Sequence, residues 1–152
     1  MRERLRKKIA RAVANQIKES SGIEISGEMD RVKIDGRNVI LVNSEPLIIE
    51  YENKYYLTVY GVLKLKPPKW KVVVDEGAMP FIINGADVVR PGILHADEGI
   101  KKGDFVYVVV EGKNTPLAVG IALVNSDEMK GEKGKAVKNI HHLKDRIWNA
   151  FF

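Results

Sequence analysis

The side chains best able to bind a metal or exchange protons near neutral pH are three histidines, whose spacing assembles no site. His95 lies close to Asp97 and Glu98, which could act as ligands on a loop. No other histidine or cysteine is near them in sequence, so the sequence favours a solvated loop. His141 and His142 are adjacent, so on a strand they point to opposite faces, one packed and one exposed. We predict no metal site and no cofactor.

The chain also lacks the patterns of nucleophilic and nucleotide-dependent enzymes. It has no cysteine, five serines and two threonines, and no hydroxyl lies in a Gly-x-Ser-x-Gly elbow. The dinucleotide fingerprint and the P-loop are both absent. Gly131 and Gly134 fit a Gly-x-x-Gly clamp, but the apolar helices that should flank such a clamp are missing, which favours a plain loop. We therefore predict that the protein is not an enzyme.

The segment 77–93 has chemistry suited to a nucleic acid. Gly85 and Gly92 have no Cβ, which permits a positive φ and close approach of backbone N–H groups to a phosphate. Pro91 stiffens the chain, and Arg90 could pair with a phosphate or stack on a base. The competing interpretation is a turn with a solvated arginine.

Apolar residues of the same segment have two possible roles. Met79, Phe81 and Ile93 could form a wall for an unstacked base, because proteins read RNA sequence mainly in single strands. The sequence favours the core for these three residues and for Ile82 and Val88.

This segment resembles the PUA domain of RNA-binding proteins. The resemblance rests on a short apolar helix that ends at a glycine, on the string Gly-Ala-Asp-x-x-Arg-Pro-Gly at 85–92 and on Lys-Gly-Asp at 102–104. Ala-Val-Gly at 118–120 continues the pattern, which covers about Lys71–Ile140. The resemblance implies a β pseudobarrel that binds structured RNA, often at a 3′ end.

The C-terminal residues narrow the resemblance. The segments 134–137 and 140–145, followed by Trp148, are similar to translation factors related to malignant T-cell-amplified sequence protein and to ligatin. Those proteins carry a preceding α+β domain of matching size. The resemblance implies binding to tRNA or rRNA, contact with the small ribosomal subunit and an initiation-factor-like protein, and no catalysis.

Basic residues supply two candidate surfaces. Residues 1–70 contain 14 basic and 9 acidic side chains, whereas residues 71–152 contain 11 of each, so the net charge of +5 lies in the N-terminal half. The predicted RNA-binding residues are Gly85, Ala86, Asp87, Arg90, Pro91, Gly92, Lys69, Lys71, Lys113 and Lys138, with Lys135 nearby. The second surface, for ribosomal RNA, comprises Arg2, Arg4, Arg6, Lys7, Lys8 and Arg11. In each case, solvated side chains are the alternative.

Hydrophobic periodicity predicts an α+β fold. Residues 1–21 read as an amphipathic helix with Leu5, Ile9, Val13 and Ile17 on its apolar face, and Gly22 as its stop. We expect this helix to pack on a small antiparallel sheet. The predicted strands are 32–35, 38–42, 46–50 and 54–62, with turns at 35–36 and 52–53 and a further alternating stretch at 62–66.

Pro67 and Pro68 predict a stiff link between two domains, residues 1–68 and residues 69–152. The second domain should be a PUA-like β pseudobarrel with strands at 70–75, 87–90, 105–111, 117–124 and 137–140. Helical turns are expected at 77–84 and 145–151, and a polar loop at 127–135.

The absence of cysteine and of a long apolar run predicts a cytoplasmic protein that binds no membrane. We also expect a monomer. The longest run without a charged residue, 114–126, is shorter than the ~20 residues that span a bilayer. Two alternatives to a translation factor remain open: an accessory module that guides an RNA-modifying enzyme, and a protein–protein adaptor.

Overall fold

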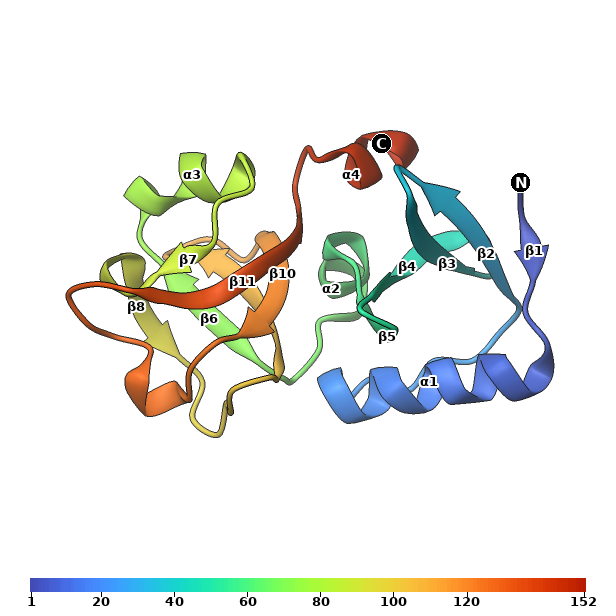
Figure 1. The fold of residues 1–152 in the computed structure, drawn as a ribbon, viewed down its shortest axis with the longest axis horizontal. Coiled ribbons are helices and arrows are strands. Elements are labelled where there is room, and N and C mark those ends of the chain that lie inside the picture. Colours follow the sequence, from blue (N-terminus) through green and yellow to red (C-terminus); the bar gives the residue numbers. More distant parts are fainter.

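The computed structural model describes residues 1–152 and contains two sheets, one in each half of the chain (Figure 1). The first is antiparallel, in the order β1-β2-β3-β4-β5. Its strands are β1 Glu3–Arg4, β2 Met29–Ile34, β3 Arg37–Val42, β4 Glu45–Tyr51 and β5 Lys54–Leu57. Helix α1 (Lys7–Ser21) and helix α2 (Val59–Leu65) pack against it. The predicted α+β class and the N-terminal helix on an antiparallel sheet are confirmed.

The second sheet is a nearly closed pseudobarrel in the order β7-β11-β10-β9-β6-β8. Its strands are β6 Lys71–Val74, β7 Val88–Val89, β8 Ile93–Ala96, β9 Phe105–Val110, β10 Pro116–Ala122 and β11 Lys135–His142. The sheet is mixed, because β6 and β9 run parallel whereas the other pairs are antiparallel. Short helices complete this half: η1 Glu76–Ala78, α3 Met79–Ile83, η2 Arg90–Gly92, η3 Ser126–Glu128 and α4 Arg146–Phe151.

Two predicted hairpin turns form as expected. Asp35 and Gly36 have φ of 51° and 77°, and Glu52 and Asn53 have φ of 49° and 65°. Positive φ at both central residues is the geometry whose twist matches that of the flanking strands, and Asp, Asn and Gly tolerate it best. A third turn of the same kind, at residues 43–44, was not predicted.

The prediction of a helix over residues 1–21 is wrong in its first turn. Residues 3–4 form β1, and the Leu5 backbone N–H donates to the Met29 oxygen (2.9 Å). Leu5 is therefore buried as part of this extended segment and not as part of the helix. The helix begins only at Lys7, and Ile9, expected on its apolar face, is 40% exposed. The extended start is held because Arg2 pairs with the Asp30 carboxylate (2.6 Å).

The prediction of strand over residues 54–66 is also wrong after Leu57. Thr58 caps α2, its Oγ1 accepting from the Gly61 N–H at 2.9 Å. Gly61 lies so close to β4 that an added Cβ would be 2.5 Å from the Leu47 oxygen. The cap and this packing outweigh the strand propensity of the valines and tyrosines. Strand β8 was not predicted.

A shared core joins the two halves. Helix α2 lies between the two sheets (Figure 1), and the core of the first sheet includes Phe105, Val119, Ile140 and Ile147 from the second half of the chain. Residues 66–70 connect α2 to β6, so the link between the two halves is short. The division into residues 1–68 and 69–152 stays a prediction. None of the four α-helices combines the length and the apolar character needed to cross a bilayer.

Asp145 fixes the last helix. Its carboxylate accepts from the Trp148 N–H (2.8 Å) and the His142 N–H (2.9 Å), and it lies 2.7 Å from Nδ1 of buried His141. Burial alone would raise the pKa of Asp145, but the His141 contact and the two backbone donors outweigh it and hold the pKa at about 2. The prediction that one of the two histidine rings is packed is confirmed at His141, whereas the other ring, His142, is half-buried and not exposed as expected.

We expect Asp145→Asn to lower the free energy of unfolding by about 2 kcal/mol at pH 7, because the shift from 3.8 to about 2 corresponds to that energy. The lowered pKa stabilises the folded state above pH ~4. This stability is lost as the pH falls through 3.8 towards 2, so the loss should be smaller in the variant. Urea unfolding from pH 7 to pH 2 measures both effects. Asp127→Asn, at an exposed acid, is the control; equal curves for the two variants would contradict the assignment.

Candidate nucleic-acid interface

Helix α3 ends in a Schellman motif that shapes the glycine-containing segment. The Ala86 N–H donates to the Phe81 oxygen (2.9 Å) and the Gly85 N–H to the Ile82 oxygen (3.0 Å), with Gly85 at φ 97°. The role of Gly85 is therefore a helix cap. Its N–H and that of Ala86 are already bonded, which corrects the expectation that they are available to a phosphate.

Asn139 of β11, the strand that pairs with β7, anchors this segment. Its Nδ2 donates to the Ile82 oxygen (3.1 Å) and to the Ala86 oxygen (3.0 Å), and its backbone N–H donates to Asp87 Oδ1 (2.9 Å). Three hydrogen bonds thus tie residues 82–87 to a strand more than fifty residues further along the chain. Sequence reasoning missed Asn139, because nothing local distinguishes it from any other polar strand residue.

Asp87 is held by charge as well. Lys135 Nζ lies 3.1 Å from Asp87 Oδ2 and Lys138 Nζ 3.9 Å from Oδ1. Burial would raise the pKa of Asp87, but the Asn139 N–H and the two ammonium groups outweigh it, so the pKa lies below its usual range. Asp87 therefore positions the segment, and the predicted contact residue Lys138 lies beside it together with Lys135.

An apolar pocket of about 300 Å³ opens beside the anchored segment. It is lined by Ala78, Phe81, Ile82, Ala86, Asp87, Val88 and Val89. Phe81 is 68% exposed and Val89 is 45% exposed, so the assignment of Phe81 to the core is wrong. Of the three residues predicted to form a wall for a base, Phe81 does line the pocket, whereas Ile93 is buried in the core and Met79 packs against it.

Arg90 lies against the loop at 131–134. The backbone N–H of Arg90 donates to the Gly134 oxygen (2.9 Å), and a Cβ on Gly131 would lie 3.1 Å from Arg90 Cδ. The Arg90 Nε is buried and has no hydrogen-bond partner. The two glycines of the Gly-x-x-Gly sequence thus make room for the arginine. Pro91 is exposed, whereas Gly92 packs within 3.2 Å of Ala78 Cβ, measured from the position its own Cβ would take.

The other predicted lysines lie elsewhere. Lys69 stands over the Trp70 ring, with its Nζ 5.3 Å from the ring centroid. Lys71 and Lys113 line a separate groove between the two halves of the molecule. The structure therefore groups Lys138, but not Lys69, Lys71 or Lys113, with residues 85–92.

The basic N-terminal surface is also divided. Arg2 and Arg4 both pair with Asp30, at 2.6 and 2.5 Å, and these contacts lower the pKa of the Asp30 carboxyl. The remaining four side chains are exposed and form no ion pair: Arg6, Lys7, Lys8 and Arg11. The first turn of α1 contains no acid. Positive charges there oppose the helix dipole, so they do not serve helix stability.

His95 lies 3.9 Å from Asp97 and is exposed, and no group of three or more metal-ligating side chains occurs anywhere in the structure.

Comparison with known proteins places these features in a family. A model of the PUA domain matches residues 70–143, and a model of a domain of unknown function, DUF1947, matches residues 2–65. An uncharacterized protein of Methanocaldococcus jannaschii is 48% identical over 124 residues, which cover 81% of this chain and 76% of the relative. The chain belongs to the PUA family. The PUA fold is an RNA-binding fold, and neither matching family indicates an enzymatic activity.

Solved structures share the whole architecture of this PUA protein. A hypothetical protein of Pyrococcus horikoshii aligns over 99% of both chains with a TM-score of 0.86 and 39% identity. A conserved PUA domain protein of Thermoplasma acidophilum aligns over the full length of both chains, with a TM-score of 0.84 and 29% identity. The DUF1947 half and the PUA half therefore occur together in these proteins, in the same arrangement.

Curated relatives of this PUA protein have names from translation. Translation machinery-associated protein 20 of Saccharomyces cerevisiae is 29% identical over 149 residues, which cover 93% of this chain and 80% of that protein. Human eukaryotic translation initiation factor 2D is 28% identical over 128 residues, which cover 78% of this chain but only 21% of the factor. The PUA protein thus corresponds to most of the first relative and to about a fifth of the second.

We expect Asn139→Ala to lower the free energy of unfolding by about 1–3 kcal/mol, because it removes the donors to two loop carbonyls. Hydrogen exchange at Ala86 and Asp87 should speed up. The matched control is Asn149→Ala, whose amide bonds one exposed carbonyl (Lys144, 3.1 Å) and should cost less than 0.5 kcal/mol. Unchanged exchange in residues 85–87 would show that Asn139 does not anchor the segment.

Proposed function

We propose that the protein binds RNA in translation, with an unstacked base of a single-stranded RNA end seated in the pocket beside Phe81. The observation that carries the proposal is an exposed aromatic ring at the mouth of an apolar pocket, in a chain of the RNA-binding PUA family. The exposed Phe81 ring forgoes the hydrophobic free energy that burial in the core would give. Stacking of a base on the ring would recover it.

The pocket is rigid where a ligand would meet it. The Schellman motif, the Asn139 hydrogen bonds and the Asp87 ion pairs hold the lining residues Ile82, Ala86 and Asp87 in place before any ligand binds. A preformed site loses little conformational entropy on binding. Lys135 and Lys138, whose side chains are 65% and 49% exposed, supply cations at its edge for the neighbouring phosphates.

The names of the relatives favour translation as the setting. The RNA would be a tRNA acceptor end, which is single-stranded, or a segment of small-subunit rRNA. An initiation-factor-like protein could supply the functions of the remaining four-fifths of the longer relative. The residues we assign to this RNA contact are Ala86, Arg90, Pro91 and Lys138, together with Phe81 and Val89.

Neither alternative has a specific observation in its favour. The exposed large apolar side chains of the N-terminal half are Met1, which precedes β1, Ile9 on α1 and Leu63 on α2. A protein–protein adaptor would need them gathered into one patch. An RNA-guiding module would use the same pocket, and co-purification with ribosomal subunits or with a modification enzyme separates it from a translation factor.

Phe81→Ala should weaken binding to intact tRNA by about 1–3 kcal/mol, or roughly 5- to 150-fold, because a stacked base is lost. The melting temperature should stay unchanged, since the ring is mostly exposed. Binding should be measured over a salt series with intact tRNA, the same tRNA without its single-stranded 3′ end, and small-subunit rRNA.

The control for Phe81→Ala is Ile9→Ala, which removes another exposed apolar side chain from a distant helix. Equal affinity of both variants for all three RNAs would place the base-binding site elsewhere. Failure of the unaltered protein to bind any of them at low salt would end the proposal.

Replacing Lys7 and Lys8 by glutamate should separate stability from binding. Acids in the first turn of α1 favour the helix by about 0.3–1 kcal/mol each, so the variant should unfold at a higher temperature. If the four exposed basic residues contact rRNA, the same variant should bind rRNA at least tenfold more weakly. Thermal unfolding and filter binding measure the two effects. A more stable variant with unchanged rRNA affinity would show that these lysines are solvated and do not contact rRNA.

A further inference from the structure

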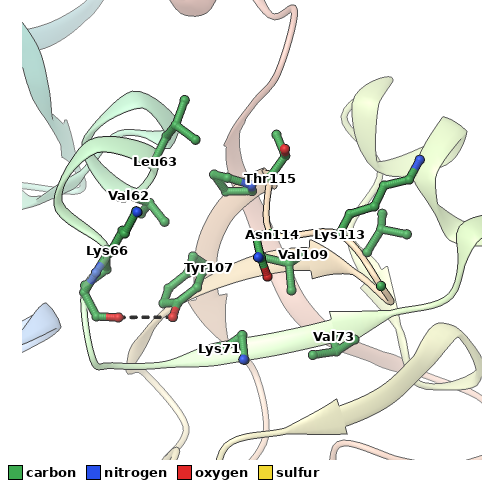
Figure 2. A pocket seen from close by; sticks show the side chains of 14 residues that line it. Val62, Leu63, Lys66, Lys71, Val73, Tyr107, Val109, Lys113, Asn114 and Thr115 are labelled. Carbon is green, nitrogen blue, oxygen red and sulfur yellow. Dashed lines mark hydrogen bonds between the residues drawn. The ribbon is translucent and has the colours of Figure 1, made fainter.

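A groove of about 690 Å³ lies between the two halves of the molecule. Figure 2 shows that its lining comes from the end of α2, from strands β6 and β9, and from the turn that precedes β10. The lining residues are Val62, Leu63, Lys66, Pro67, Lys71, Val73, Tyr107, Val109, Val110, Gly112, Lys113, Asn114, Thr115 and Pro116. Because residues of both halves share one apolar core, the two sides of the groove are packed against each other beneath it.

The groove contains three cations and no acid. Lys66, Lys71 and Lys113 belong to its lining, and none of them takes part in an ion pair. Lys66 lies at the C-terminus of α2, where the helix dipole favours a cation, so its presence has a structural reason. Lys71 and Lys113 have no such reason. Like charges gathered in a concave surface raise the local potential and attract anions.

An aromatic ring and unused polar groups lie among these cations. The half-buried Tyr107 donates its hydroxyl proton to the Pro67 oxygen (3.1 Å), which holds the ring in place (Figure 2). The side chains of Asn114 and Thr115 form no hydrogen bond within the chain, and both residues are exposed. An amide and a hydroxyl can bond the edge of a base or a ribose hydroxyl.

We propose that this groove is a second RNA-binding site, in which Lys71 and Lys113 contact successive phosphates of a single strand and one base lies against Tyr107. The inference rests on the proposed function, since it requires an RNA partner. The occupant follows from the combination of phosphate-binding cations with an aromatic face and polar groups, which is the composition of single-strand binding grooves. The pocket beside Phe81 and the groove share no lining residue, so substitutions in one can be tested separately from the other.

The decisive measurement is the salt dependence of binding. The double variant Lys71→Ala, Lys113→Ala should lower the magnitude of the slope of log K against log salt by about 1.4, because each phosphate contact on a single strand contributes ~0.7. The control is Lys33→Ala, Lys102→Ala, which removes two exposed lysines that lie in neither site. The RNA is a single strand of about twenty nucleotides carrying a 4-thiouridine, and crosslinks should form within β9 or the turn at 112–115.

The outcomes distinguish the groove from the pocket. A lowered slope in the groove variant, an unchanged slope in the control and crosslinks in residues 105–115 support the groove, whatever Phe81→Ala does. Binding that weakens in Phe81→Ala but keeps its slope in the groove variant overturns the groove alone. Displacement of the RNA by poly-glutamate at equal charge concentration would assign the groove to an acidic protein segment and overturn it too. Absence of any RNA binding removes both proposals.

Discussion

Phe105, at the start of β9, is buried in the core of the other half of the molecule. Its ring stacks on Tyr56 with centroids 5.9 Å apart and planes 9° from parallel, and Val119, Ile140 and Ile147 enter the same cluster. Burying one such ring contributes about 1.5–3 kcal/mol, a large share of the stability of a chain this size. Because this contact fixes the two sheets relative to each other, it also decides which lysines share the groove between them.

Polar side chains on or just after β11 fix the loops and the last helix, as the apolar core fixes the sheets. Asn139 bonds groups more than fifty residues away, whereas Asp145 bonds groups three or four residues away. Asn139 and Asp145 each hold three groups, and both lie on or just after β11, the strand that runs from the PUA barrel towards the N-terminal half. One holds the segment beside the pocket, and the other caps the helix that returns to the first sheet. A single strand therefore couples the order of the proposed RNA site to the packing of the two halves.

The surface departs from what stability alone would favour in three places. Lysines occupy the first turn of α1, Phe81 stands in solvent, and three cations face one groove without an acid. Each departure carries an energetic cost in the unbound protein, and each has the chemistry to contact RNA. Sites where local rules are broken without compensation are where function is expected. Away from the proposed sites, several cations are paired with acids, as Arg2 and Arg4 are with Asp30.

The sequence by itself determined the fold class, the tight hairpin turns at 35–36 and 52–53, and the PUA resemblance, because these depend on short-range patterns of apolar residues, glycines and turn formers. It also pointed to residues 85–92, where Gly85 proves to cap α3. Only the tertiary structure decided that residues 59–65 form a helix, that Phe81 is exposed, that Asn139 anchors the loop and that Lys71 and Lys113 lie apart from Lys138. Those outcomes depend on contacts between residues distant in the chain, such as Gly61 with Leu47 and Asn139 with Ile82, and no local pattern encodes them.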